Sequence, residues 1–335
     1  MALAPDAPSL SAARLTGTRP AEQTRARYPD ETGVIERHGV HVAWERYGDG
    51  FPTLLLMPTW SIIHSRHWKG QIAYLARHFR VVTFDGRGNG RSDRPRASAA
   101  YDDTEFAADA IAVLDATGTD RAIIAGLSAG AGYVLQTAVR YPDRVSGAIF
   151  VGSSVGLGDP IPRPGIVPFD KVPPAFEGWS RYGAAGWRYD WAAFAEFFFG
   201  QVFNELHSTK QIDDAVDWAC DTDAETIITA ERAAYLSPLE SVAASEPVGA
   251  EPKPPAASER EPAALGYARR VRCPSLVIHG EADLISDVSG GRRLAAALGA
   301  RLVILAGGGH DPLGRDPVKI NLLFRDFIRQ LESAP

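Results

Sequence analysis

Hydrophobic and polar residues alternate near the start of the chain and follow a different pattern after residue 52. The stretch GVIERHGVHVAWERYG alternates around His38 and Gly39, which predicts an antiparallel hairpin at one edge of a sheet. From Thr53 onward, short continuous apolar runs are separated by amphipathic stretches. Strands that are buried on both faces and separated by helices are typical of a parallel sheet with crossover connections. The pattern therefore predicts an α/β fold, with a mostly parallel central sheet and helices on both faces.

The individual elements of this fold can be assigned from the same pattern. Apolar runs mark the expected strands at TLLLM, RVVTFD, AIIAG, GAIFVGS, SLVIHGEAD and ARLVILAG. Amphipathic stretches predict helices over residues 66–78, 104–117, 129–140, 288–298 and 316–331. The alternation stops near Val155 and resumes before SLVIHGEAD, so the expected core consists of residues 31–154 and 269–335.

The interval 155–268 is expected to be an inserted, mainly helical cap. It opens with the proline-rich stretch DPIPRPGIVPFDKVPPAF and then concentrates aromatic residues. We expect most of these aromatic side chains to form a small core and some to face the sheet, and Trp187 is a candidate substrate contact. Residues 244–262, rich in Pro, Ala and Glu, predict a flexible surface excursion of the cap, and residues 1–30 predict a poorly ordered arm.

Composition narrows the classes of partner. The chain has 335 residues, of which 45% are hydrophobic, and this is enough for a large packed core. Its formal net charge of -6 gives no sign of a basic binding surface, so we expect neither a nucleic-acid nor a membrane partner. We expect a small-molecule substrate, and a homodimer is one option for the oligomeric state. The N-terminal segment has no basic stretch followed by an apolar one, and no run approaches about 18 apolar residues, so we expect a cytoplasmic protein. Cys220 and Cys273 are far apart in sequence, which argues against a disulfide framework or a metal site.

Ser128 stands at the centre of a Gly-x-Ser-x-Gly pentad, GLSAG, between an expected strand and an expected helix. At such a junction the serine occupies a strained turn where larger neighbours would clash, and its hydroxyl is presented as a nucleophile. A second match, GSSVG, is centred on Ser154, but it runs into GLGDPIPRPG, which cannot form a helix. We therefore assign Ser128 as the nucleophile and Ser154 as a residue of a turn at a strand end.

A nucleophilic serine also needs a base to take its proton and a carboxylate to orient that base. His310, in the glycine-rich loop LAGGGHDP after the expected last strand, is the candidate base, and Asp283, just past the strand in VIHGEADLIS, is the candidate acid. The chain order serine, aspartate, histidine is that of nucleophile-elbow hydrolases. His64 and His67 follow TLLLM near the expected mouth of the pocket and are candidate substrate contacts.

With these motifs in place, residues 33–331 resemble the α/β-hydrolase family. The motifs GLSAG, HGEAD and GGGHDP carry the resemblance, and the run RVVTFDGRGNGRSDRP supports it. In that run, the resemblance implies that Asp85, Arg87 and Ser92 brace the loop and do not react. It also implies that the insertion is a cap over the serine that shapes the pocket, and that no metal or organic cofactor is needed.

The expected oxyanion hole departs from the family pattern. Many members carry His-Gly after the strand that corresponds to TLLLM, whereas this chain reads Met-Pro-Thr-Trp. Pro58 has no backbone N–H, so Thr59 or Trp60 must donate to the developing negative charge. We expect Trp60 to donate, with Ala129 at the start of the helix as the second donor.

These features predict hydrolysis of a carboxylic ester, lactone or thioester with an aromatic or otherwise apolar portion. Alternatives on the same fold are C–C bond hydrolysis, acyl transfer or cyclisation, and a cofactor-free perhydrolase; a small-molecule receptor is the non-enzymatic alternative. A serine at the elbow argues against haloalkane dehalogenase and epoxide hydrolase chemistry, because those enzymes use an aspartate there.

Overall fold

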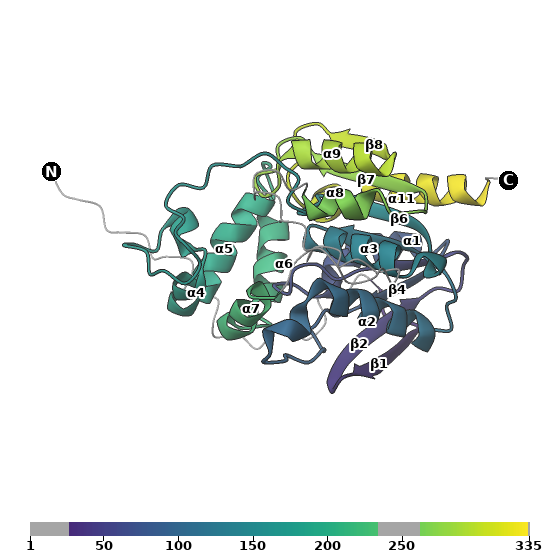
Figure 1. The fold of residues 1–335 in the computed structure, drawn as a ribbon, viewed down its shortest axis with the longest axis horizontal. Helices are drawn as coiled ribbons and strands as arrows, with labels where there is room; N and C mark the ends of the chain where they lie inside the picture. Colours follow the sequence, from purple (N-terminus) through teal and green to yellow (C-terminus); the bar gives the residue numbers. More distant parts are fainter. Residues whose placement is uncertain (1–26, 234–261, 334–335) are drawn as a thin grey trace, which may run out of the picture.

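A computed structural model describes residues 27–233 and 262–333 of the chain. Within these ranges, eight strands form one sheet in the order β1-β2-β4-β3-β5-β6-β7-β8 (Figure 1). The strands are β1 (Glu31–Arg37), β2 (Val40–Tyr47), β3 (Thr53–Leu56), β4 (Arg80–Phe84), β5 (Ala122–Leu127), β6 (Val145–Val151), β7 (Ser275–Gly280) and β8 (Arg301–Leu305). The predicted edge hairpin is confirmed: β1 pairs with β2 and β2 with β4 in antiparallel register, and the remaining neighbours are parallel.

The helices connect these strands or belong to residues 155–233, which are called the cap region below. They are α1 (Lys69–Leu75), α2 (Asp103–Ala116), α3 (Ala129–Arg140), α4 (Ala184–Tyr189), α5 (Trp191–Val202), α6 (Thr209–Ala219), α7 (Ala224–Glu231), α8 (Ala263–Ala268), α9 (Val288–Leu298), α10 (Pro312–Arg315) and α11 (Pro317–Glu332). The expected helices over 129–140 and 288–298 are found with those bounds. The stretch expected as one helix over 66–78 is a 3-10 turn, Ser65–Trp68, followed by the shorter α1.

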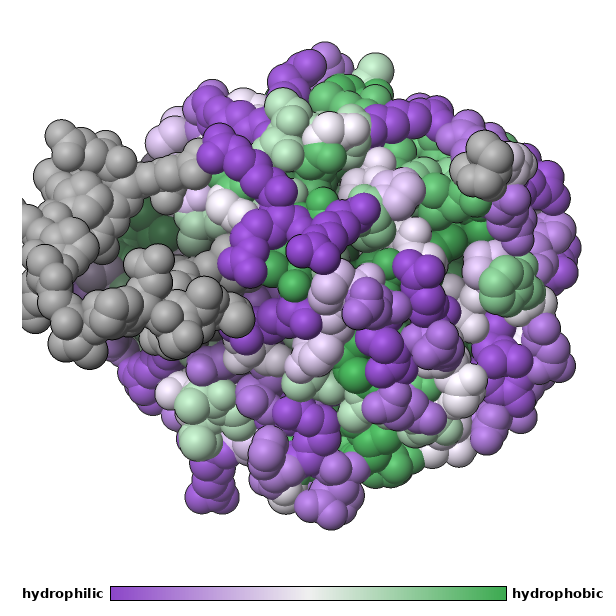
Figure 2. Space-filling view, turned by 45° about the vertical axis from the view of Figure 1, so that its right-hand side comes forward, coloured by the Kyte–Doolittle hydropathy of each residue, from purple (hydrophilic) through white to green (hydrophobic). Residues whose placement is uncertain are grey.

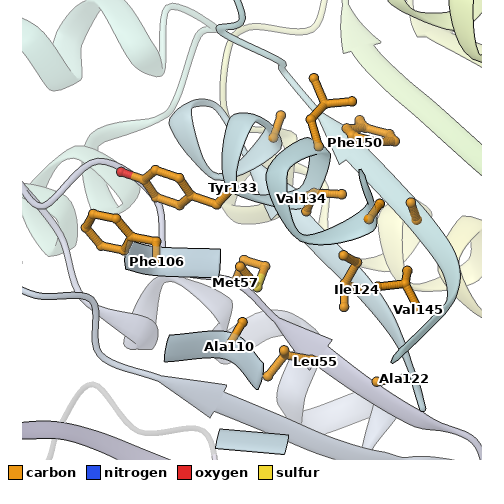
Figure 3. Packing of buried hydrophobic residues seen from close by; sticks show 14 of the residues in the cluster. Leu55, Met57, Phe106, Ala110, Ala122, Ile124, Tyr133, Val134, Val145 and Phe150 are labelled. Atoms are coloured by element: carbon orange, nitrogen blue, oxygen red, sulfur yellow. The ribbon is translucent and has the colours of Figure 1, made fainter. Parts of the chain in front are cut away.

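Each central strand is buried on both faces because its successive side chains enter two different hydrophobic clusters. In β3, Leu54 and Leu56 join a cluster with α1 and α11, whereas Leu55 joins the opposite cluster with α2 and α3. Figure 3 shows this second cluster, where side chains of the strands meet those of α2 and α3. The ring planes of Phe106 and Tyr133 stack there with their centroids 4.2 Å apart. The continuous apolar runs of the sequence therefore reflect a sheet covered on both sides.

The strand order reverses at β3, and this positions the candidate site. The chain passes from β3 to β4 on one side and then returns to β5 on the other side. In a parallel sheet, a crevice forms at the carboxyl ends of strands at such a reversal. The loops after β3 and β5, which carry Trp60 and Ser128, therefore meet at this edge.

Helices α4 to α7 lie together at one end of the molecule, beyond the edge of the sheet (Figure 1). Their buried side chains form a third hydrophobic cluster, rich in Trp and Phe, which also takes in Ile62 and Ile63 from the loop after β3. This loop therefore joins the cap region to the core. Helix α8, which falls inside the expected cap interval, packs instead against α3 and α9, because Ala264, Tyr267 and Ala268 are buried in the core cluster.

The loop after β4 is braced by the three residues singled out in the sequence. The hydroxyl of Ser92 donates to the backbone oxygen of Asp85 at 2.7 Å, and the Asp85 carboxylate accepts from Ser65 at 2.6 Å. The buried guanidinium of Arg87 makes two hydrogen bonds to Asp109, at 2.6 and 2.8 Å. These bonds fix the wall of the crevice next to the loop that follows β3.

The predicted arm and the predicted flexible excursion fall mainly outside the described residues. Of the arm, residues 27–30 are described, and of the excursion only Pro262. The face drawn in Figure 2 mixes hydrophilic side chains with smaller hydrophobic areas. Because apolar atoms are common on water-exposed surfaces, this mixture by itself marks no docking area.

Candidate active site

Ser128 forms a strained turn between β5 and α3. Its backbone has φ 56° and ψ -119°, a conformation that is costly for a residue with a side chain. The neighbouring chain explains the two flanking glycines. A Cβ atom on Gly126 would lie 2.3 Å from the backbone oxygen of Gly130, and one on Gly130 would lie 2.5 Å from that of Pro58. The turn therefore requires glycine at both positions.

The three residues proposed as a catalytic series are hydrogen-bonded to one another. His310 Nε2 lies 2.9 Å from Ser128 Oγ, and His310 Nδ1 lies 2.8 Å from Asp283 Oδ2. His310 is 3% exposed and Asp283 6%. They come from the loops after β8 and β7, so the parallel order of the strands brings both loops to the same sheet edge as Ser128.

The surroundings of Asp283 keep its carboxylate ionised. Burial opposes the charge, but the charge of His310, hydrogen bonds from His279 and His310, and the backbone N–H of Ser286 outweigh burial and hold the pKa of Asp283 well below its ordinary value. Its other oxygen accepts from the backbone N–H groups of Ile285 and Ser286, at 2.7 and 2.9 Å. An ionised and immobile Asp283 fixes the proton of His310 on Nδ1, which leaves Nε2 free to accept a proton from Ser128.

Ser154 contacts Ser128 directly. The two hydroxyl oxygens lie 3.1 Å apart, and the hydroxyl of Ser154 also bonds to that of Ser286. The backbone N–H of Ser154 donates to the backbone oxygen of Ser128 at 3.3 Å. No helix follows Ser154, which agrees with the sequence interpretation of a turn. Its contact with Ser128 was not predicted, although the second Gly-x-Ser-x-Gly match after the neighbouring strand was a signal for it.

Two of the three expected oxyanion donors border the same space as Ser128. Trp60 and Ala129 line the cavity described below, and within the described part of the chain neither donates its backbone N–H in a hydrogen bond. Thr59 is buried and lies outside the cavity lining, and its hydroxyl donates to the backbone oxygen of Leu127 at 2.8 Å. The geometry is thus compatible with Trp60 and Ala129 as donors and gives Thr59 a role in holding the loop.

A cavity of about 590 Å³ lies over Ser128, between the sheet edge and the cap region. Such a volume accommodates a small organic molecule. Much of its wall is aromatic and combines core and cap residues: Trp60, Tyr101, Phe106, Tyr133, Trp179, Tyr182 and Phe198. Some cap aromatics therefore face the sheet, as the sequence predicted.

The three residues expected to contact substrate lie outside the lining of this cavity. Trp187 is 0% exposed and packs behind the wall, with its ring centroid 5.8 Å from that of Trp60 and 5.3 Å from that of Tyr182. His64 is buried and bonds to Asp221 at 3.2 Å, beside a separate small polar pocket. His67 is buried as well, and burial together with the nearby His64 lowers its pKa to about 3, so its ring is neutral. The loop after β3 turns under the cap cluster, which explains why these histidines do not reach the cavity.

Sequence reasoning missed Arg163, a cap residue that lines the cavity. It lies in the proline-rich stretch, where neither periodicity nor a motif distinguishes it. Within residues 27–233 and 262–333, no three His, Cys, Asp or Glu side chains are grouped as metal ligands. In these same ranges, no helix has the length and apolar character needed to cross a membrane.

Comparison with known proteins gives one family and several partial relatives. The family model described as alpha/beta hydrolase fold matches residues 50–317. A segment of 129 residues is 32% identical to the 2-hydroxymuconate semialdehyde hydrolase of Pseudomonas sp. (strain CF600), and covers 37% of this chain and 43% of that protein. A segment of 101 residues is 36% identical to epoxide hydrolase B of Mycobacterium tuberculosis, and covers 30% of this chain and 27% of that protein. The chain thus matches less than half the length of these curated relatives.

A solved structure extends the similarity to the whole fold. The enol-lactonase from Burkholderia xenovorans LB400 superposes with a TM-score of 0.67 and 22% sequence identity, over 89% of this chain and 100% of that chain. At this level of identity the likeness concerns the fold.

Proposed function

This chain belongs to the α/β hydrolase fold family, and we propose that it hydrolyses a carboxylic ester, lactone or thioester through an acyl-enzyme on Ser128. The observation that supports this proposal is the hydrogen-bonded series of Ser128, His310 and Asp283 at the base of a cavity of about 590 Å³. The aromatic wall favours a small substrate with an apolar or aromatic portion.

In the acylation half of the reaction, Ser128 Oγ attacks the carbonyl carbon of the substrate while His310 Nε2 takes the hydroxyl proton. The charge on the imidazolium is balanced by Asp283, which stays ionised. The carbonyl oxygen becomes negative, and the backbone N–H groups of Trp60 and Ala129 donate to it. His310 then gives its proton to the leaving alcohol or thiol, and the acyl group remains on Ser128.

In the deacylation half, water replaces the leaving group. His310 takes a proton from the water as its oxygen attacks the acyl carbon, and the same donors hold the second oxyanion. His310 then protonates Ser128 Oγ as the acid is released, which restores the resting site. Loss of the serine in such a unit costs about a millionfold in kcat, whereas loss of one oxyanion donor costs about 10² to 10³.

C–C bond hydrolysis is a second candidate, favoured by the similarity of one segment to a 2-hydroxymuconate semialdehyde hydrolase. The same serine and oxyanion donors serve that reaction, but its leaving group is a carbon atom that must be protonated. Simple esters separate the two candidates, because a dedicated C–C hydrolase leaves 4-nitrophenyl esters nearly untouched. The likeness to an epoxide hydrolase does not favour epoxide chemistry, since the elbow residue here is a serine.

Intact-mass spectrometry after treatment with a small fluorophosphonate tests the nucleophile. We expect one adduct on the wild-type protein and on Ser154→Ala, and none on Ser128→Ala. Release of 4-nitrophenol from short-chain and aromatic esters then identifies ester hydrolysis. A wild-type protein that forms no adduct and releases no 4-nitrophenol contradicts the proposal and favours a receptor.

A further inference from the structure

Arg163 is a cation on the cavity wall that has no carboxylate partner among the described residues. Its guanidinium stacks on the ring of Trp179, 4.6 Å from the ring centroid, and one nitrogen donates to the backbone oxygen of Ile285 at 3.0 Å. Its Nε atom is buried and makes no hydrogen bond within the described part of the chain. The side chain is thus held in a fixed orientation, with donor capacity left over.

Three acidic residues line the same wall, and within the described residues none of them forms an ion pair with Arg163. Asp159 pairs with Arg293 at 2.6 Å. Asp287 accepts from the backbone N–H of Ser289 at 2.8 Å, and Glu231 accepts from the hydroxyl of Tyr182 at 2.5 Å. The guanidinium of Arg163 therefore has no direct anionic partner in the described part of the wall, and an anionic ligand group would supply one.

Residues of the cavity lining also hold three buried donors. Trp60 Nε1, the hydroxyl of Tyr101 and the hydroxyl of Ser153 belong to residues that line the cavity, and within the described residues none of these buried atoms has a hydrogen-bond partner. An indole N–H can only donate, and burial raises the pKa of Tyr101, so its phenol also remains a donor. These atoms are enclosed in the wall, so the ligand class is inferred from Arg163 and not from them.

The position of Arg163 links this charge to the catalytic series of the proposed function. The backbone oxygen of Ile285 accepts from Arg163, and the backbone N–H of Ile285 donates to Asp283 at 2.7 Å. Arg163 therefore lies beside the loop that carries the orienting acid. A substrate group bound by Arg163 would share the cavity with the carbonyl attacked by Ser128.

We propose that Arg163 is the centre of a carboxylate subsite, and that the substrate is an ester or lactone bearing a free carboxylate away from the cleaved bond. The planar guanidinium matches the two oxygens of a carboxylate. Because the guanidinium is already stacked on Trp179, the Arg163 side chain loses less conformational entropy when the ligand binds. This proposal rests on the proposed hydrolase function and adds the substrate class to it.

The test compares two esters that differ at the end remote from the cleaved bond: mono-4-nitrophenyl adipate, which ends in a carboxylate, and methyl 4-nitrophenyl adipate, which ends in a neutral methyl ester. For the wild-type protein we expect kcat/KM to be at least tenfold higher for the acid than for the neutral diester. Arg163→Gln is expected to lower this ratio at least tenfold, mainly through KM, and Arg163→Lys is expected to keep part of it because the charge remains. The matched control is Arg188→Gln, which removes a cap arginine that pairs with Glu225 at the surface and lies outside the cavity lining.

A wild-type preference for the neutral diester, or an equal fall of the ratio in Arg163→Gln and Arg188→Gln, overturns the subsite. Failure of the hydrolase proposal is recognised separately, because that protein forms no fluorophosphonate adduct and cleaves neither ester. Calorimetric titration of the wild-type protein with glutarate and with its diamide tests the subsite without turnover. It is used if the hydrolase proposal fails or if Arg163→Gln does not fold. Tighter binding of glutarate supports the subsite, and equal or absent binding of the two overturns it.

Discussion

The hydroxyl oxygen of Ser154 lies 3.1 Å from that of Ser128. Because Asp283 fixes the proton of His310 on Nδ1, Nε2 accepts from Ser128, and Ser128 must in turn accept from Ser154. Ser286 completes the series as the donor to Ser154. A hydrogen bond to Ser128 Oγ stabilises negative charge on this atom. Such charge develops when Oγ leaves the acyl carbon, as in the deacylation half of the proposed reaction.

Ser154→Ala is therefore expected to lower kcat by about 3- to 10-fold, the value of one hydrogen bond of about 0.5–1.5 kcal/mol. Ester turnover and the rate of fluorophosphonate labelling measure the effect, and the adduct itself is still expected. Labelling that disappears in Ser154→Ala but persists in Ser128→Ala would reverse the assignment of the nucleophile.

Asp283→Asn is expected to lower kcat by about 10⁴-fold, because the asparagine amide stabilises the wrong tautomer of His310. The substituted side chain also loses the charge that balances the imidazolium. Turnover of a 4-nitrophenyl ester measures the loss, and circular dichroism checks that the protein is folded. A folded variant with less than a tenfold loss would show that Asp283 does not orient the base.

Arg87→Met is expected to lower the free energy of unfolding by about 1.5–3 kcal/mol, because the buried Asp109 loses two hydrogen bonds and keeps only Arg37 as an ion-pair partner among the described residues. The side chains of Arg87 and Asp109 are 1% and 0% exposed. The exposed pair of Arg188 and Glu225 serves as the control, since breaking a surface pair costs about 0–1 kcal/mol. Urea unfolding of Arg87→Met and Arg188→Gln distinguishes them, and equal losses would mean that the buried pair adds nothing beyond a surface pair.

The contribution of Asp311 to stability is expected to fall between pH 4 and pH 7. Burial raises the pKa of this carboxyl group from 3.8 to about 6, although backbone N–H groups of Gly314 and Leu313 oppose the shift. The folded state therefore binds the proton more tightly than the unfolded state, and this contribution is present at low pH and lost as the pH rises through about 6. The shift corresponds to about 3 kcal/mol.

Asp311→Asn keeps an oxygen that can cap α10 but has no charge to bury. The difference in unfolding free energy between this variant and the wild-type protein is expected to grow in favour of Asn by up to about 3 kcal/mol from pH 4 to pH 7. Urea unfolding at several pH values measures it. A difference that stays constant with pH would show that Asp311 does not titrate in this range.

The sequence by itself determined the sheet, the elbow and the chain positions of the hydrogen-bonded series. Periodicity and glycine stereochemistry are local properties, so the hairpin, the bounds of α3 and α9 and the strained turn at Ser128 could be predicted without contacts. The positions of Asp283 and His310 followed from one further rule, that parallel strands end at a common edge.

Only the tertiary structure decided which side chains border the cavity. His64 and His67 lie in the expected loop, yet the packing of that loop beneath the cap cluster buries them elsewhere. Trp187 belongs to the cap cluster itself and is packed behind Trp60 and Tyr182 of the aromatic wall. Arg163 and Ile285 meet although they are 122 residues apart in the chain, and no periodic pattern encodes such a contact. Cap packing depends on the shapes of many side chains at once, whereas strands and elbows depend on a few neighbouring residues.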